Sequence, residues 1–277
     1  MRFYISVDAE GISGVHKLTQ VIPGKPEYNT IRKLMAGDVN AAVRGALRAG
    51  ATEIVVNDTH NYGDNLLISD LDRHVTLLSG ADKPLIMAEG LQERFDAMAL
   101  VGYHSKKGQR GVVSHTFFFG AIFEAKINGK PFGEADFVAH MGGFKGTPMV
   151  LLTGDDQVTT QGLRDMPGLR TVAVKSCIGN GSAGLRHPDI TAAEIEEAAY
   201  QAVLNAKHVK PLTLEGDVEL EILFSTATQA GLACTFAGFI GDQEVHNRVR
   251  YVAKDYGEAY MAFMHALRLG AYYRDDT

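Results

Sequence analysis

Two carboxylates lie two residues apart near the start of the chain, in the segment Ser6-Val7-Asp8-Ala9-Glu10-Gly11. The preceding residues, 2–7, are apolar and β-prone, and Gly11 interrupts them, which predicts a buried strand that ends in a loop. Residues i and i+2 of a strand face the same side, so Asp8 and Glu10 can point into one site. Two ionised carboxylates this close repel each other unless a cation or a hydrogen-bond donor joins them. The pair therefore indicates either a cation site or a polar turn at a strand end.

Histidines follow two further predicted strands at the equivalent point. Residues 53–57 precede His60, and residues 98–103 precede His104. In an open, mostly parallel α/β sheet the carboxyl ends of the strands meet at one edge, and ligands bind in the crevice outside it. A single histidine is more often structural, but two histidines and a carboxylate pair at one edge predict a metal site. Imidazole and carboxylate ligands together favour zinc.

The elements that must position these residues alternate between strand and helix. This order is expected of a doubly wound, Rossmann-like α/β fold with a mostly parallel sheet. The predicted strands are 2–7, 53–57, 75–78, 98–103, 148–152 and 170–174, and the predicted helices between them are 29–49 and 134–145.

Residues 117–133 interrupt this alternation. Two β-prone runs there flank Asn128-Gly129, a strong hairpin-turn dipeptide, so we expect an inserted hairpin that lies over the strand ends. Beyond residue 180 the pattern is less regular, with helices predicted over 191–207 and 255–269 and a strand near 217–224. We therefore expect a metal-binding α/β domain over 1–180, with the hairpin inserted in it, and a second, smaller α/β lobe over 181–277.

Composition excludes several classes of protein. The chain has 277 residues, 45% of them hydrophobic, which is typical of a globular protein. Its first apolar run is too short for a secretory signal, and no stretch approaches the roughly 18 apolar residues of a membrane span, so we expect a soluble, cytoplasmic protein without a membrane partner. A net charge of −6 argues against nucleic-acid binding. Cys177 and Cys234 are too few for a disulfide framework or a thiolate zinc site.

Two other motifs have both a structural and a functional interpretation. The basic cluster 106–110 follows His104, so it is either a solvated loop or a site for an anionic substrate group. Residues 179–184 match the pattern G-x-G-x-x-G, but Leu185-Arg186-His187-Pro188 separates them from the next predicted helix. A dinucleotide-binding loop should open a helix directly. A flexible loop with glycines at positive φ is therefore the favoured interpretation, and a substrate loop at the sheet edge is the alternative.

The chain resembles a known family, the zinc-dependent D-aminopeptidases associated with dipeptide-transport operons. The Ser-x-Asp-x-Glu-Gly signature typical of that family is present as Ser6 to Gly11. Segments similar to further family motifs follow in the family's order: 57–61, 102–105, 114–116 and 128–134. The resemblance spans the chain and implies hydrolysis of short peptides or amides with an N-terminal D-amino acid, such as D-Ala, by a water that two zinc ions activate.

The resemblance also implies which residues form the site. It implies His115 as the catalytic side chain and two zinc ions per chain, with Asp8 bridging them. The implied metal ligands are Asp8, Glu10, His60, His104 and Glu134. From the residues alone, Glu134 is only an acidic residue in the first turn of a helix. Charge counting agrees with two ions, because three carboxylates are neutralised by two Zn²⁺ and one hydroxide.

Several alternatives stay open from the sequence. His115 could act as a base, an acid or a nucleophile, or could orient a metal ligand. Either a metal or an acidic side chain such as Asp58 could hold the substrate's α-amino group. A two-metal phosphoesterase would use a similar ligand set, and a non-catalytic small-molecule-binding module could share the fold. The preference for D-amino acids rests on the resemblance and not on any individual residue.

The apolar run 117–123 follows His115 closely. It either packs within its own chain or is covered by another subunit, because a patch of this kind is rarely left in water. The resemblance implies a homo-oligomer, a decameric ring that admits only short peptides.

Overall fold

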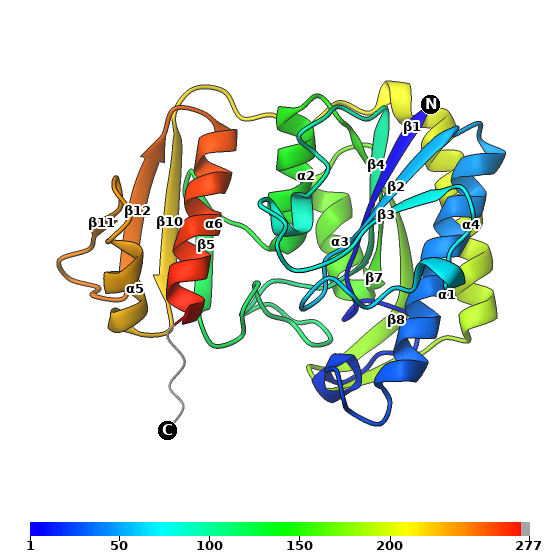
Figure 1. Cartoon of the computed structure of the whole chain (residues 1–277), viewed down its shortest axis with the longest axis horizontal. Helices are drawn as coiled ribbons and strands as arrows, with labels where there is room; N and C mark the ends of the chain where they lie inside the picture. Colours follow the sequence, from blue (N-terminus) through cyan, green and yellow to red (C-terminus); the bar gives the residue numbers. More distant parts are fainter. Residues whose placement is uncertain (273–277) are drawn as a thin grey trace.

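The computed structural model describes residues 1–272, which form two β-sheets and the helices packed on them (Figure 1). The larger sheet has the strand order β3-β2-β1-β4-β7-β8-β9. Its strands are β1 (Arg2–Val7), β2 (Glu53–Asp58), β3 (Val75–Leu78), β4 (Ala97–Tyr103), β7 (Met149–Asp155), β8 (Arg170–Gly179) and β9 (Ser182–Leu185). Only β9 among these strands runs antiparallel to its neighbour. The predicted α/β fold with a mostly parallel sheet is confirmed.

Helices cover both faces of the larger sheet. They are α1 (Tyr28–Arg48) and α4 (Pro188–Asn205) on one face, and α2 (Glu134–Phe144) and α3 (Asp156–Asp165) on the other. Coverage on both sides explains why β4 and β7 are buried along their whole length and read as continuous apolar runs. None of the described helices is long and apolar enough to cross a membrane.

The strand order reverses direction around β1. The chain adds β2 and then β3 on one side of β1, and returns to place β4 on the other side. In this register Val7, the last residue of β1, lies opposite both Asp58 of β2 and Val101 of β4. Such a reversal opens a crevice at the carboxyl ends of the strands. The fold therefore places the residues that follow β1, β2 and β4 beside one another.

The smaller sheet has the order β11-β12-β10-β5-β6. Its elements are β5 (Ile122–Ile127), β6 (Lys130–Pro131), β10 (Val218–Phe224), β11 (Ile240–Gly241) and β12 (Arg248–Ala253), with α5 (Ala227–Ala233) and α6 (Tyr256–Tyr272). The predicted hairpin is β5–β6, with positive φ at Asn128 and Gly129 as a type I′ turn requires. The β5–β6 hairpin pairs with β10 in the smaller sheet and is not part of the larger one. Residues 117–119, which precede it, line the cavity beside the residues that follow β1 and β2.

The two sheets do not divide at residue 180. Beyond that residue, β9 pairs with β8, and α4 packs on α1 and β8 of the larger sheet. Conversely, the β5–β6 hairpin belongs with the strands after residue 217. We therefore propose that the second domain combines the hairpin with residues from about 212 onward. This domain is formed by two separate segments of the chain, so no single boundary in the sequence defines it.

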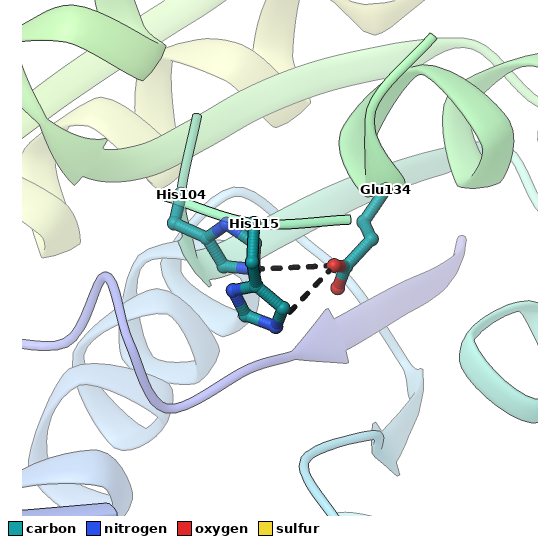
Figure 2. A group of neighbouring side chains, drawn as sticks. All are labelled: His104, His115 and Glu134. Atoms are coloured by element: carbon teal, nitrogen blue, oxygen red, sulfur yellow. Dashed lines mark ion pairs between the residues drawn. The ribbon is translucent and has the colours of Figure 1, made fainter. Parts of the chain in front are cut away.

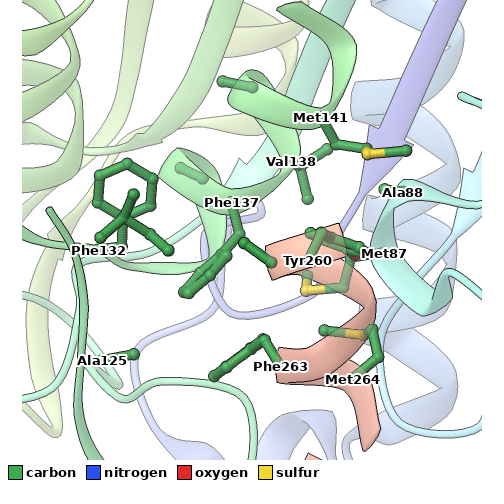
Figure 3. Packing of buried hydrophobic residues seen from close by; sticks show 14 of the residues in the cluster. Met87, Ala88, Ala125, Phe132, Phe137, Val138, Met141, Tyr260, Phe263 and Met264 are labelled. Atoms are coloured by element: carbon green, nitrogen blue, oxygen red, sulfur yellow. The ribbon is translucent and has the colours of Figure 1, made fainter. Parts of the chain in front are cut away.

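An aromatic cluster joins the smaller sheet to α2 (Figure 3). Phe137 of α2 stacks on Phe263 of α6, with ring centroids 4.2 Å apart, and meets Phe132 edge-on at 5.4 Å. The Tyr256 hydroxyl donates to the Phe137 carbonyl at 2.8 Å. Aromatic pairs of this kind stabilise by about 0.5–1.5 kcal/mol beyond the area they bury. The cluster fixes the helix whose first residue is Glu134.

Gly11 supplies a test of this architecture. A Cβ on Gly11 would lie 2.0 Å from the carbonyl oxygen of Tyr103, so the loop after β1 cannot approach the end of β4 with any larger residue. We expect Gly11→Ala to lower the free energy of unfolding by about 1–3 kcal/mol or more. Gly37→Ala is the control, because Gly37 lies in α1 with open space around it, and it should stabilise by about 0.5–1 kcal/mol. Denaturant unfolding measures both, and equal effects would contradict this packing.

Candidate metal centre

The loop that carries Asp8 and Glu10 is held along the end of β4. The Asp8 amide donates to the Val101 carbonyl at 2.9 Å, and the Gly11 amide donates to the Gly102 carbonyl at 2.7 Å. Both carboxylates are buried. The main chain thus continues strand-like pairing past β1, which brings both side chains to the crevice.

His60 and His104 reach the crevice from the neighbouring strands. His60 lies two residues beyond β2, and His104 directly follows β4. One ring nitrogen of each histidine bonds to a main-chain carbonyl, His60 Nε2 to Val21 at 2.8 Å and His104 Nδ1 to Ser105 at 3.0 Å. The other nitrogen of each ring therefore faces the carboxylates. Metal-binding histidines are typically oriented in this way.

Asp8 is shared between two groups of potential ligands. Its Oδ1 lies 3.3 Å from His60 Nδ1, which is 3.1 Å from Glu10 Oε2. Its Oδ2 lies 3.3 Å from His104 Nε2, which is 3.4 Å from Glu134 Oε1. The structure thus brings together all five residues expected as metal ligands. Two cation positions with Asp8 between them are compatible with this arrangement.

Unpaired polar atoms test whether a metal fits here. Asp8 Oδ2, Glu10 Oε2 and His104 Nε2 are buried and form no hydrogen bond of acceptable geometry with any residue that the structure describes. Buried polar atoms are rarely left without a partner, and each such atom costs about 1–3 kcal/mol. A cation in the crevice would satisfy all three. Nitrogen and oxygen donors of this kind are those that zinc binds, so the residues fit that ion.

The charges of the site act on its histidines. Burial alone would lower the pKa of His60, but Glu10 and Asp8 raise that pKa well above 6.5. The same balance holds for His104, whose pKa burial would lower and Glu134 and Asp8 raise. Burial would raise the pKa of Asp8, but the two histidines hold it well below 3.8. Protons and metal ions therefore compete for the same nitrogen atoms.

Glu134 and His115 complete the site (Figure 2). Glu134 is the first residue of α2, and its Oε1 accepts a hydrogen bond from the Phe117 amide. His115 Nε2 lies 3.7 Å from the same oxygen. The ligand atoms of His104, His115 and Glu134 lie within 4.8 Å of one another, so His115 is also within reach of a metal. Its place at the site agrees with the expectation, and its role remains to be tested.

His115 is held on three sides. Its ring stacks between those of His104 and Phe119, each with a centroid distance of 4.1 Å, and its Nδ1 bonds to the Val113 carbonyl at 2.9 Å. Val113 and Phe117 have φ of 52° and 56°, which is a strained conformation for a branched or bulky residue. Strain on both sides of His115 indicates that the surrounding packing fixes this loop. The Nε2 atom is thereby aimed at the carboxylates.

The glycine-rich segment 179–184 supports this loop and does not cradle a nucleotide. It forms the turn of the β8–β9 hairpin, so no helix begins there. The Asn180 carbonyl accepts a hydrogen bond from the Val113 amide at 2.8 Å. Val112, Val113 and Cys177 form a small buried cluster beneath it. The segment therefore positions His115 from outside the site.

Two further candidates from the sequence have structural roles. The Asp58 carboxylate is buried and accepts hydrogen bonds from the amides of Asn65 and Leu66 and from the Asn65 side chain, so it is not available to a substrate. In the basic cluster, Lys107 Nζ donates to the Phe119 carbonyl and Arg110 to the Cys177 carbonyl. These bonds brace the loop that carries His115.

A cavity of about 170 Å³ opens over the candidate ligands. Its lining combines polar and apolar residues. The polar lining includes Asp8, Glu10, His60, His115 and Glu134, and the apolar lining includes Leu18, Val21, Ile22, Ile86, Met87, Phe117, Phe118 and Leu267. A largely apolar cavity with a few convergent polar groups is the usual form of a small-molecule site.

Known proteins match the chain over almost its whole length. Residues 1–265 match the family model described as D-aminopeptidase, peptidase family M55. A D-aminopeptidase of Bacillus subtilis (strain 168) is 33% identical over 267 residues, which cover 95% of this chain and 96% of that protein. A solved structure, the Zn-dependent D-aminopeptidase DppA from Bacillus subtilis, a self-compartmentalizing protease, matches with a TM-score of 0.94 at 32% identity over 99% of both chains. These matches confirm the resemblance, and the chain belongs to the D-aminopeptidase family, peptidase family M55.

Proposed function

We propose that this protein is a zinc-dependent aminopeptidase that releases N-terminal D-amino acids from short peptides or amides. The family and the names of both relatives support the activity, the metal and the D preference. The observation that carries the proposal is the position of Asp8, whose two oxygens each approach a different histidine. A carboxylate in that position can bridge two ions.

The proposed ligands are Asp8, Glu10 and His60 for one zinc ion and Asp8, His104 and Glu134 for the other. When bound, such a pair polarises a scissile carbonyl and lowers the pKa of a water towards about 7. The charges of this chain support two ions, because three buried carboxylates would leave a single zinc site negative. The Asp58 carboxylate already accepts hydrogen bonds from Asn65 and Leu66, so we propose that the zinc centre binds the substrate's α-amino group.

We assign the proton transfers to His115. Its Nδ1 is bonded to Val113, so its Nε2 is the atom that faces the site. From there Nε2 can take a proton from the attacking water and return it to the leaving amine, as a general base and then a general acid. The stacked rings of His104 and Phe119 keep the imidazole in one orientation during both steps. Direct attack by His115 on the carbonyl is the alternative.

The lining of the cavity favours a peptide over a phosphate ester. No lysine or arginine is found among the described residues that line it. Sites for phosphate groups usually include such cations. The apolar residues of the lining instead suit an uncharged substrate side chain.

The exposed aromatic side chains beside His115 support a homo-oligomer. Phe118, Phe119 and Phe123 are 46%, 40% and 53% exposed, whereas Phe117 packs on Phe137 and Phe263. Exposed apolar clusters of this kind mark interaction surfaces. Together with the self-compartmentalizing relative, they support the proposed decameric ring with enclosed active sites. The cytoplasmic location stays a prediction from the sequence.

Removal of metal tests the proposed cofactor. Chelation should abolish hydrolysis of a D-amino acid amide and lower the melting temperature, because zinc binds only the folded state. Glu10, Glu134 and Asp8 raise the pKa values of His60 and His104 in the metal-free site, so zinc binding should release protons and weaken as the pH falls. Calorimetry in buffers of different ionisation enthalpy measures this release. Full activity of verified metal-free protein would refute the proposal.

Substitution of His115 tests its role in the chemical step. His115→Ala should lower kcat by roughly 100-fold or more while the zinc content stays at the wild-type level. His74→Ala is the control, because His74 is an exposed histidine paired with Asp72. Measurement of kcat and of zinc content for both variants distinguishes a catalytic role of His115 from a metal-binding one. Loss of metal from His115→Ala would instead make His115 a ligand.

The mass in solution tests the proposed assembly. Light scattering at micromolar concentration should give a multiple of the 30.0 kDa chain, with ten chains for the proposed ring. A mass of one chain would contradict the assembly. Rapid cleavage of a long unfolded polypeptide would contradict the enclosed active sites, because such a substrate should be excluded.

A further inference from the structure

Lys175 is a buried lysine in β8 that is not among the residues lining the cavity. The strand is irregular at this point, because Gly154 pairs with Ala173 and the next residue, Asp155, pairs with Lys175. The extra residue is a β-bulge, which changes the direction of the side chains that follow it. Val174 and Lys175 are both buried, which is possible for strand neighbours because helices cover both faces of the larger sheet.

The lysine contacts the loop through two main-chain carbonyls. Its Nζ donates to the Glu10 carbonyl at 2.6 Å and to the Ile12 carbonyl at 2.9 Å. The Gly11 amide bonds to the Gly102 carbonyl and the Ser13 amide to the Asp38 carboxylate, and the two lysine bonds hold the carbonyl side of the turn between them. A neutral amine also has two N–H groups, so both bonds persist in either protonation state.

Burial of a lysine at this position lowers the free energy of unfolding. An ammonium group loses its hydration on burial, and two carbonyl acceptors offset that loss only in part. A Leu or Met would fill the same space without this cost. We therefore look for the role of Lys175 in the segment that its two bonds hold, the turn between Asp8 and Ile12.

We propose that Lys175 is the positioning residue of the metal-binding loop. By holding the carbonyls of Glu10 and Ile12, it sets the path of the main chain so that the Asp8 and Glu10 carboxylates converge on His60. Lys175 touches no reacting atom and acts only through the ligands. The inference rests on the proposed function, because it assigns Lys175 to the same zinc centre.

Zinc affinity of the full-length protein tests this role. Lys175→Met removes both bonds and keeps an unbranched side chain that is only one atom shorter. Competition with a chromophoric chelator should show that this variant's Kd for zinc is raised roughly 10- to 100-fold, the usual cost of losing a group that orients a ligand. Lys175→Gln, which retains N–H donors, should lose less affinity, and it carries the test if Lys175→Met does not fold.

Val174→Ala is the matched control, because Val174 is equally buried on the same strand and lies in the core on the α1 and α4 side. It should lower thermal stability and leave the Kd for zinc unchanged. A wild-type Kd in Lys175→Met, or an equal loss of affinity in Val174→Ala, would overturn the inference and leave the proposed function intact. A wild-type protein that binds no zinc would overturn both.

Discussion

The repulsion among three buried carboxylates is the constraint on which the site depends. Asp8, Glu10 and Glu134 lie in one crevice, and the nearest cationic groups are the imidazoles of His60 and His104. Unless positive charge enters the crevice, this arrangement opposes folding. If zinc supplies that charge, as we propose, stability and catalysis draw on the same ions.

The scaffold explains how residues so far apart in the sequence meet. The reversal of strand order at β1 brings the ends of β1, β2 and β4 together, and four of the five proposed ligands follow these strands. Glu134 is positioned by helix α2 and not by a strand end, and α2 is fixed by aromatic contacts with α6 and the β5–β6 segment. His115 depends on a strained loop supported by the β8–β9 hairpin. The larger sheet thus positions most of the metal ligands, and its contacts with other elements position the rest.

Much of this fold can be predicted from the sequence. The strand over 75–78 is predicted to the residue, and Asp8, His60 and His104 are placed at strand ends because apolar runs stop just before them. Helix α3 is not predicted, since its sequence DQVTTQGLRD is short, mostly polar and contains Val, two Thr and Gly, which are weak helix formers. The convergence of Glu134 requires the family resemblance, because a first-turn acid has an adequate local explanation. The bonds from Lys175 to the Glu10 and Ile12 carbonyls join segments far apart in the chain, and a sequence pattern does not reveal such contacts.

Zinc anomalous scattering from crystals of the wild-type protein tests the proposed two-zinc centre most directly. We expect two peaks per chain on either side of the Asp8 carboxylate, one beside Glu10 and His60 and the other beside His104 and Glu134. A single peak would contradict the bridging role of Asp8. Peaks elsewhere in the chain, or none in an active enzyme, would contradict the proposed centre as a whole.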